Sequence, residues 1–230
     1  MRTTRIAELL QPFLGSAEDR RLTTDDLLKI STYIDLLLRW NARINLTAIR
    51  NEDEIVTRHF GESLFAASHL FPGVARAPSP ASMSQTKPDA PAHATRLIDI
   101  GSGAGFPGLP IKIWAPDIEL TLIESNQKKA TFLREIARQL TLMNINVFAG
   151  RAEDYQDPPA EVVTLRAVER FQNALPIAAS LVAPQGRLAL LISRSQLPQV
   201  HDLAREFEWP PPLPIPLSAS RILVIGARET

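Results

Sequence analysis

The chain has 230 residues, of which 45% are apolar and 22% are charged, a balance that is ordinary for a folded globular protein. Its 25 basic and 25 acidic residues cancel over the whole chain, and they nearly cancel within residues 1–72 and within residues 96–230. The sequence contains no cysteine, which excludes disulfides, zinc–thiolate sites, iron–sulfur clusters and a cysteine nucleophile. The composition therefore excludes bulk disorder and does not favour a strongly basic nucleic-acid-binding protein.

The apolar segments of the chain are short. The longest aliphatic run, at residues 188–192, is far below the roughly 20 residues that a membrane-spanning helix needs. The first five residues, MRTTR, are followed by Glu8 and Gln11 instead of an apolar stretch, so the sequence predicts no secretory signal. We therefore expect a cytoplasmic protein that does not use a membrane as a partner.

Three helices are predicted in the first 72 residues, at about 6–14, 23–40 and 51–70, from apolar residues at helical spacing. Thr23 offers a hydroxyl that can cap the second helix, and Asn51 with Glu54 has the spacing of a capping box at the start of the third. We interpret residues 1–72 as an N-terminal helical cap. Residues 73–95 contain four prolines, six alanines and three serines but no large apolar residue other than Val74 and Met83, which predicts a flexible linker.

From residue 96 onward, short apolar runs alternate with helical patterns. Strands are predicted at residues 97–100, 120–123, 145–148, 162–165, 188–192 and 221–225, with helices at 127–140 and 171–181. The proline-rich segment 208–217 is predicted to be an extended surface turn. Strands that alternate with helices predict an α/β fold with a doubly wound, mostly parallel sheet over residues 96–230.

The most informative stretch is the glycine-rich sequence DIGSGAGFPG at residues 99–108, which follows the first predicted strand. Its glycines at 101, 103 and 105 suit a loop whose backbone passes close to a ligand. A dinucleotide-binding fingerprint would need glycine or alanine at position 106, which is Phe106 here. Asp99 ends the strand, and its carboxylate suits a cationic amino group better than a pyrophosphate. This loop therefore favours S-adenosylmethionine over NAD.

Two further strand ends carry residues that suit a nucleoside. Glu124 ends the second strand, where a carboxylate can accept hydrogen bonds from both ribose hydroxyls, a feature that NAD enzymes share. The turn Gly150-Arg-Ala-Glu-Asp follows the third strand, where Glu153 could meet an adenine edge. From the residues alone, the chain is predicted to be a nucleoside-cofactor enzyme and more specifically a methyltransferase.

Several motifs in order resemble one family. They are NLT at residues 45–47, RH at 58–59 with ES at 62–63, DIGSGAGFPG at 99–108, GRAE at 150–153, LRA at 165–167 and SRILVI at 220–225. Together they look like the RsmG (GidB) family, the 16S ribosomal RNA guanine-N7 methyltransferases. The resemblance covers about residues 23–228 and is interrupted by residues 73–95. The family usually has Asp where this chain has Glu62.

The resemblance implies a class I (Rossmann-like) methyltransferase fold, S-adenosyl-L-methionine as cofactor, and the small ribosomal subunit or its 16S rRNA precursor as partner. It implies cofactor contacts at Gly101, Phe106, Ala152, Glu153 and Arg166, the last near the methyl-transfer pocket. With the residues chosen by strand position, the expected cofactor-binding set is Asp99, Gly101, Gly103, Gly105, Phe106, Glu124, Ala152, Glu153 and Arg166.

The residue types limit the methyl acceptor. Methylation of pyrimidine C5 commonly uses a cysteine, which the chain lacks, and the string Asp157-Pro-Pro-Ala precedes the fourth strand and is interpreted as a turn and not as an amine-methylation loop. Guanine N7 offers a lone pair and no proton to remove, so a site without a general base is compatible with it. Arg166 follows the fourth strand and could hold guanine O6 or a phosphate, which makes it the candidate for substrate positioning in catalysis. The alternative for Arg166 is a salt bridge to Glu169 or another acid.

Other polar residues are candidates for RNA contact, namely Asn45, Arg58, His59, Arg170 and Arg194. Arg170 and Arg194 could equally be solvated surface charges, and His59 could be a packed residue. The four histidines, at positions 59, 69, 93 and 201, share no ligand spacing, so no metal site is predicted. We expect a monomer. Alternatives that the residues leave open are another RNA or small-molecule acceptor, a non-catalytic cofactor-binding module, and an NAD-dependent oxidoreductase.

Overall fold

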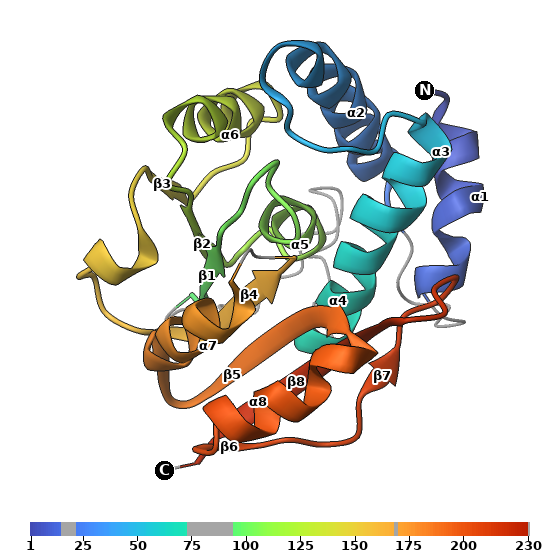
Figure 1. Cartoon of the computed structure of the whole chain (residues 1–230). Coiled ribbons are helices and arrows are strands. Elements are labelled where there is room, and N and C mark those ends of the chain that lie inside the picture. The colour runs from blue at the N-terminus through green and yellow to red at the C-terminus, as the bar shows by residue number, and fades with distance from the viewer. Residues whose placement is uncertain (15–21, 73–93, 168–169, 230) are drawn as a thin grey trace, which may run out of the picture.

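A computed structural model describes residues 1–14, 22–72, 94–167 and 170–229 of the chain. Most of the predicted linker, 73–95, lies outside these residues. The described strands form one sheet in the order β3-β2-β1-β4-β5-β8-β6, with β7 also paired to β8 (Figure 1). The strands are β1 Arg96–Ile100, β2 Glu119–Ile123, β3 Ile145–Phe148, β4 Ala160–Arg166, β5 Val182–Ser193, β6 Phe207–Glu208, β7 Leu213–Pro214 and β8 Arg221–Arg228.

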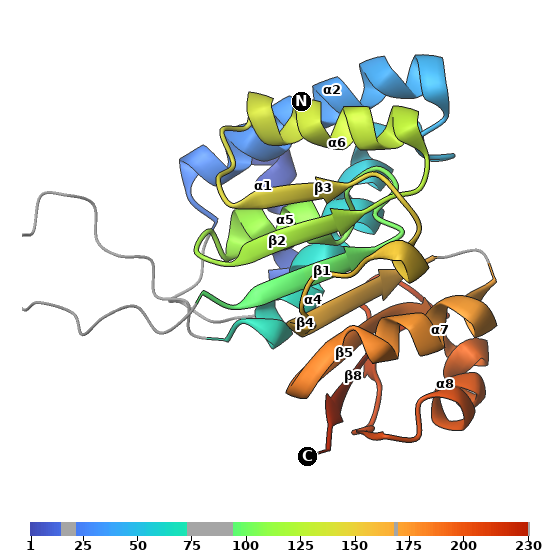
Figure 2. The same cartoon turned by 90° about the vertical axis from the view of Figure 1, so that its left-hand side faces the viewer.

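The five strands from β3 to β5 are parallel; β8 pairs antiparallel with β5, and the short strands β6 and β7 pair antiparallel with β8. Strand β1 lies between β2 and β4, so the chain leaves β1 in one direction and later returns to its other side. The arrowheads of β1, β2 and β4 point to the same edge of the sheet (Figure 2). In such a sheet, ligands bind outside the carboxyl ends of the strands at the position where the order reverses. The α/β, mostly parallel sheet predicted from the sequence is confirmed.

Helices cover both faces of the sheet, as its doubly wound pattern requires. The helices are α1 Thr3–Leu14, α2 Thr24–Ile44, α3 Glu52–Glu54, α4 Glu62–Leu70, α5 Gly108–Trp114, α6 Gln127–Gln139, α7 Phe171–Ser180 and α8 Leu197–Leu203. Successive residues of a strand point to opposite faces, so Leu97 belongs to the apolar cluster that includes residues of α1, α2, α4, α5 and α6, whereas Ile98 and Ile100 belong to the cluster on the side of α7 and α8. None of the described helices is long and apolar enough to span a bilayer.

The N-terminal cap is built into the main core of the protein. Ile6 of α1, Ile34 of α2 and Leu64 of α4 are fully buried, and they belong to the same apolar cluster as Leu97 of β1 and Phe132 of α6. The burial of each such side chain contributes about 1.5–3 kcal/mol. The helices of the cap and the sheet therefore share one apolar core. Without the cap, some of the apolar side chains that the sheet contributes to this core would be exposed.

Both predicted N-capping residues are used, Thr23 in a full capping box and Asn51 through its side chain alone. Thr23 forms a capping box with Asp26 at the start of α2, and the Asn51 side chain accepts a hydrogen bond from the Glu54 backbone at the start of α3. The third predicted helix is continuous in extent, but its middle part, Ile55–Gly61, is a π-helix (η1) between α3 and α4. Such an extra residue in a helical turn is common at functional sites.

The C-terminal part departs from the sequence prediction. The segment expected to be a surface turn at 208–217 contributes to two short strands, β6 and β7, and Ile215 within it is 1% exposed. Helix α8 was not predicted, because only Val200 of its seven residues is buried and its periodic signal is correspondingly weak. The last strand, β8, extends beyond the predicted end because it pairs with β5 as far as Ala227 and with β6 at Arg228.

Gly61 provides a test of how the cap packs. A Cβ at this position would lie 2.6–2.8 Å from ring atoms of Phe13 in α1, so the ring occupies the space of the missing side chain. We predict that Gly61→Ala lowers the free energy of unfolding by about 1–3 kcal/mol, although alanine favours a helix over glycine by about 1 kcal/mol. Urea unfolding of both proteins measures the change.

The companion variant Phe13→Leu separates the two effects. Its smaller side chain leaves room at position 61, so Gly61→Ala in that background should cost far less than in the wild type. A stabilising Gly61→Ala in the wild-type background would show that the Phe13 ring moves aside freely and would contradict the prediction.

Candidate functional site

A cleft of about 630 Å³ lies at the carboxyl ends of β1, β2 and β4, the edge where the strand order reverses. Its volume is in the range of small-molecule and cofactor sites. Four segments of the core line it together with the cap: the glycine loop, the end of β2, the turn after β3, and the segment from the end of β4 into α7. The sequence-predicted residues that line it are Gly101, Gly103, Phe106, Glu124, Ala152, Glu153, Arg166, His59 and Arg170.

The glycines of the loop differ in what they adjoin: two line the cleft and one lies against the cap. Gly101, Gly103 and Gly105 have φ values of 65°, 57° and 91°, in the left-handed region that favours glycine. Gly101 and Gly103 line the cleft, whereas Gly105 does not. A Cβ on Gly105 would lie 2.3 Å from the Tyr33 hydroxyl oxygen of α2. Position 105 is therefore a site of close approach between loop and cap, which places this expected cofactor residue away from the cleft.

Asp99 lies beneath the loop and does not line the cleft. Its side chain is fully buried on the α5 side of the sheet, where Oδ2 accepts a hydrogen bond from the Gly108 amide (3.1 Å) and Oδ1 accepts one from the Thr164 hydroxyl (2.8 Å). Burial raises the pKa of Asp99 to about 6, against the lowering effect of these hydrogen bonds. The direct contact with a cofactor amino group expected from the sequence is corrected accordingly: this carboxylate fixes the start of α5 to β4.

Glu124 holds the glycine loop and faces the cleft. Its Oε2 accepts a hydrogen bond from the Gly103 amide (2.9 Å), and its Oε1 accepts one from the Asn126 amide (2.7 Å). Each carboxylate oxygen retains a second lone pair that can accept a hydrogen bond from a ligand. Because Glu124 is only 6% exposed, its position is fixed before any ligand arrives.

The turn after β3 forms another wall of the cleft. Ala152 and Glu153 begin the short 3₁₀-helix η2, Ala152–Asp154, and both line the cleft beside Arg151. The Cβ that Gly150 lacks would lie 2.7 Å from the Phe148 ring, so the turn passes tightly over the end of β3. Sequence reasoning did not select Arg151 or Lys129, the latter from α6, although both line the cleft.

Phe106 joins the loop to the cap through ring stacking. Its ring lies between Tyr33 (centroid distance 5.4 Å, interplanar angle 9°) and His59 (4.7 Å, 16°), and Phe60 meets it edge-on at 5.1 Å. Tyr33 also donates a hydrogen bond from its hydroxyl to the backbone oxygen of Ala104. Aromatic pairs of these geometries add about 0.5–1.5 kcal/mol each beyond their burial. The cap therefore fixes the conformation of the glycine loop.

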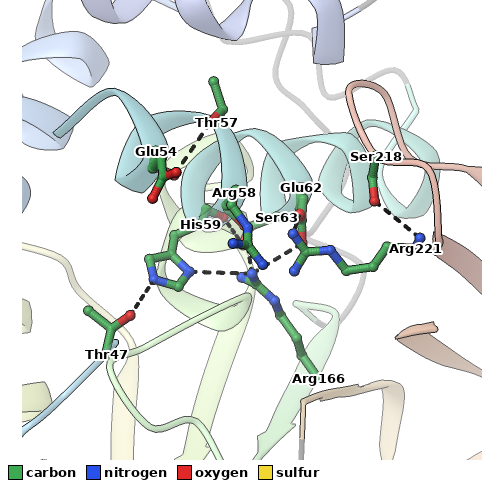
Figure 3. A network of polar contacts seen from close by, with 10 residues as sticks. All are labelled: Thr47, Glu54, Thr57, Arg58, His59, Glu62, Ser63, Arg166, Ser218 and Arg221. Carbon is green, nitrogen blue, oxygen red and sulfur yellow. Dashed lines mark hydrogen bonds and ion pairs between the residues drawn. The ribbon is translucent and has the colours of Figure 1, made fainter. Parts of the chain in front are cut away.

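His59 lines the cleft and is part of a polar chain (Figure 3). Its Nδ1 lies 3.3 Å from Nη2 of Arg166, and its Nε2 lies 2.8 Å from the Thr47 hydroxyl. Since a guanidinium can only donate, Nδ1 accepts and the proton of the neutral ring is on Nε2. Burial, followed by repulsion from Arg166 and Arg58, lowers the pKa of His59 to about 3. The imidazole is therefore neutral near pH 7 and its Nδ1 is occupied.

Arg166 connects β4 to the cap. Its side chain is 7% exposed, and Nη2 donates to the backbone oxygen of Arg58 (2.6 Å) and to Oε2 of Glu62 (3.1 Å). The second carboxylate oxygen of Glu62 pairs with Arg221 of β8 at 2.6 Å (Figure 3). The acid that pairs with Arg166 is thus Glu62, whereas the other candidate, Glu169, lies outside the described residues. Nη1 of Arg166 is buried and has no hydrogen-bond partner in the described part of the chain.

This arrangement adds an expected effect on stability to the prediction for an Arg166 variant. The sequence predicts that Arg166→Ala abolishes activity and leaves the fold intact. Removing one partner of a buried ion pair leaves the other uncompensated, which typically costs about 3–5 kcal/mol. Glu62 would keep Arg221 as a partner, so the cost is expected at the lower end of this range, but the substitution is not neutral for the fold.

The remaining candidates for RNA contact are dispersed. Asn45 ends α2 in the left-handed conformation and is exposed outside the cleft, and Arg194 is exposed after β5. Arg58 lines a second, smaller cavity. Arg170 lines the main cleft at the start of α7 with a φ of 57°, which is uncommon for a residue other than glycine.

Sequence reasoning missed several residues that shape the site. Tyr33 carries no motif signal and is not among the residues that the sequence selects. Thr47, Glu62 and Arg221 stand inside quoted family motifs, but nothing in their spacing indicates that Glu62 and Arg221 meet each other. Among the described residues, no three His, Asp or Glu side chains are grouped so that they could hold a metal ion.

Comparison with known proteins places the chain in a family. The family model described as rRNA small subunit methyltransferase G matches residues 26–75 and 82–209. The chain belongs to this family. The methyltransferase G model resumes at residue 82, so the stretch without a family counterpart, 76–81, is shorter than the interruption at 73–95 expected from the motifs.

Two relatives carry the same name, ribosomal RNA small subunit methyltransferase G. The relative from Chromobacterium violaceum is 34% identical over 186 residues, covering 80% of this chain and 78% of its own. The relative from Streptococcus pyogenes serotype M5 is 38% identical over 168 residues, covering 71% of this chain but 63% of its own. The match to the streptococcal methyltransferase G thus spans less than two thirds of that protein.

Solved structures agree on the fold. The structure of P. horikoshii TYW2 in complex with MeSAdo superposes with a TM-score of 0.51 and 16% sequence identity over 60% of this chain and 58% of its own. At this level of identity the likeness shows a common fold.

The low pKa of His59 predicts a pH effect on stability. Unfolded histidine takes up its proton near pH 6.5, but the folded protein resists protonation until about pH 3. Between these values the unfolded state binds more protons, so the free energy of unfolding falls as the pH is lowered through this window. We predict that the stability difference between wild type and His59→Gln shrinks, on the order of 1 kcal/mol per pH unit, from pH 6.5 downward.

Urea unfolding at a series of pH values measures this difference. The matched control is His201→Gln, which replaces an exposed histidine of α8 outside both cavities. An equal pH trend in the two variants would contradict a specific effect of buried His59.

Proposed function

We propose that the protein transfers the methyl group of S-adenosyl-L-methionine to N7 of a guanine in 16S ribosomal RNA. The observation that carries the proposal is the match of the methyltransferase G family model to both the cap and the core, the two parts that build the cleft. The curated relatives are named for the small ribosomal subunit, which supports the class of substrate.

The residues of the cleft fit this cofactor. Glu124 has free lone pairs at a strand end, where ribose hydroxyls can donate to it. Backbone at Gly101 and Gly103 can approach a ligand closely, while Ala152 and Glu153 form the wall assigned to adenine. Phe106, 7% exposed, contributes the edge of an apolar surface. When bound, S-adenosylmethionine supplies an electrophilic methyl group on a sulfonium sulfur.

The other residues of the cleft support an acceptor that needs no general base. His59 is neutral, but its basic nitrogen faces the Arg166 guanidinium, so it cannot readily accept a proton from a substrate. Guanine N7 has no proton to lose. Arg166 lines the cleft, and its buried guanidinium is suited to positioning an acceptor atom such as guanine O6. Fixed orientation and exclusion of water are the main requirements of a direct displacement.

An RNA partner is supported by the charges around the cleft. Four of its described lining residues, Lys129, Arg151, Arg166 and Arg170, are cationic, against the carboxylates of Glu124 and Glu153. Among the expected RNA contacts, His59 and Arg170 are in the cleft and Arg58 lies beside it, while Asn45 and Arg194 would act only with a larger surface. We propose the small subunit or its precursor as partner, a monomer as the working unit, and the cytoplasm as the place of reaction.

The proposal is tested by methyl transfer to small ribosomal subunits from a strain that lacks this protein. Radiolabelled S-adenosylmethionine serves as donor, and mass spectrometry identifies the modified nucleoside. We expect label in 7-methylguanosine. Cofactor binding without label on any subunit or precursor would instead favour a non-catalytic module, and label in another nucleoside would overturn the assignment of N7.

Glu124 gives a separate prediction for cofactor binding. We predict that Glu124→Gln weakens S-adenosylmethionine binding by about 10- to 100-fold, since the amide loses the charge and one acceptor oxygen while keeping the size. Calorimetry measures the affinity. The control is Glu119→Gln, at the exposed opposite end of the same strand. Equal affinity in wild type and Glu124→Gln would refute the ribose role of this carboxylate.

A further inference from the structure

A second cavity of about 320 Å³ lies next to the main cleft, between the cap and the segment that leads into β8. Thr57, Arg58 and Glu62 line it from the helix of the cap, and residues 216–221 line it from the other side. Two neighbouring residues of the π-helical turn line different sites: His59 lines the main cleft, and Arg58 lines the second cavity. Glu62 lines the second cavity and pairs with Arg166, which lines the main cleft (Figure 3).

Positive charge exceeds negative charge around this cavity. Three guanidinium groups, those of Arg58, Arg166 and Arg221, lie near the carboxylate of Glu62, which is the one acidic group among the described residues that line the cavity (Figure 3). Both oxygens of that carboxylate are used, one by Arg166 and one by Arg221. Arg58 makes no ion pair with any residue that the structure describes, so the charges that line this cavity sum to one positive charge, and Arg166 adds a second from the side of the main cleft.

Part of this charge is shielded from water. The side chains of Arg166 and Arg221 are 7% and 25% exposed. Burial lowers the pKa of Arg221, and repulsion from Arg58 lowers it further, while Glu62 opposes both effects. Bringing an anion to such a site is favourable, because it compensates cations that water solvates poorly.

The cavity also contains a hydroxyl donor. Ser218 accepts a hydrogen bond from the Arg221 amide at 3.1 Å, which leaves its own proton free to donate. The Thr57 hydroxyl already donates to the backbone oxygen of Asp53 at 3.0 Å and adds no donor. At the rim, Leu217 is 73% exposed and has a φ of 58°, a strained conformation for a branched side chain. Strain of this kind concentrates at binding loops.

We propose that the second cavity binds a phosphate group, supplied by the backbone of the RNA strand whose guanine enters the main cleft. The Arg58 and Arg221 guanidinium groups and the Ser218 hydroxyl would donate hydrogen bonds to the phosphate oxygens. The source of the phosphate rests on the proposed function, whereas the chemistry of the cavity does not. The contact would fix the strand relative to Arg166, because Glu62 joins Arg221 to Arg166.

Arg58 is the best position for a test, because its side chain is exposed and only its backbone oxygen supports Arg166. Steady-state methylation of small ribosomal subunits is compared for wild type, Arg58→Ala, Arg58→Lys and Ser218→Ala at several salt concentrations. Arg39→Ala is the control, since Arg39 is an exposed arginine of α2 that lines neither cavity.

We expect Arg58→Ala to raise KM about tenfold with little change in kcat, since a phosphate contact is made equally in the ground and transition states. The dependence of log affinity on log salt should become shallower by about one unit, and Arg58→Lys should restore much of the affinity. Ser218→Ala should raise KM by a smaller factor. Arg39→Ala should have the KM of the wild type. If Arg39→Ala raised KM as much as Arg58→Ala does, the effect would not be specific to the cavity and the proposal would be overturned.

A readout without turnover keeps the cavity testable if the proposed function fails. Side-chain ¹⁵N resonances of Arg58 and Arg221 are followed during titration with inorganic phosphate, with guanosine monophosphate and with a 16S RNA fragment. Shifts with all three, and displacement of inorganic phosphate by the RNA, support the proposal. Shifts with inorganic phosphate alone would indicate a free-anion site and overturn the RNA source. No shift with any probe would overturn the phosphate site itself.

Discussion

The Glu62 carboxylate is the interaction on which the arrangement of the site depends. It lies on the cap, yet it pairs with Arg166 at the end of β4 and with Arg221 at the start of β8. The Glu62 side chain is 3% exposed, so removing its charge from water has an energetic cost. The ion pairs with Arg166 and Arg221 offset this cost. The pairing therefore fixes how the cap sits on the carboxyl edge of the sheet, and with it the shape of both cavities.

Apolar packing extends the same constraint. Phe106 is stacked between Tyr33 and His59, so the glycine loop cannot change conformation without disturbing two cap residues. His59 also contacts Arg166, and Arg166 pairs with Glu62. The loop, the cap and the strand ends thus form one network of rings and charges, and a cleft built in this way is organised before its ligands bind.

The sequence predicts the fold well where local signals and global structure agree. The apolar runs predict the parallel strands, and both the strand-end residue Glu124 and the loop residue Gly101 line the cleft. The predictions that the structure changes, for Asp99, Gly105 and Arg166, have a common physical cause. Each depends on a contact between residues that are far apart in the sequence. Spacing cannot show that Asp99 points beneath the loop to Thr164, or that Gly105 is required by Tyr33, 72 positions earlier. For Arg166, the acid nearby in sequence was considered, whereas the partner that the structure shows is 104 positions away.

The π-helical turn at Ile55–Gly61 has a consequence for how this site could have arisen. A π-helical turn corresponds to an α-helix with one additional residue, and each residue of an α-helix advances by about 100° around its axis. The extra residue rotates everything after it, so that Glu62 faces the strand ends while His59 still faces Phe106. A single inserted codon in an ancestral helix would suffice to create this register, and losing it would turn the carboxylate away from both arginines at once.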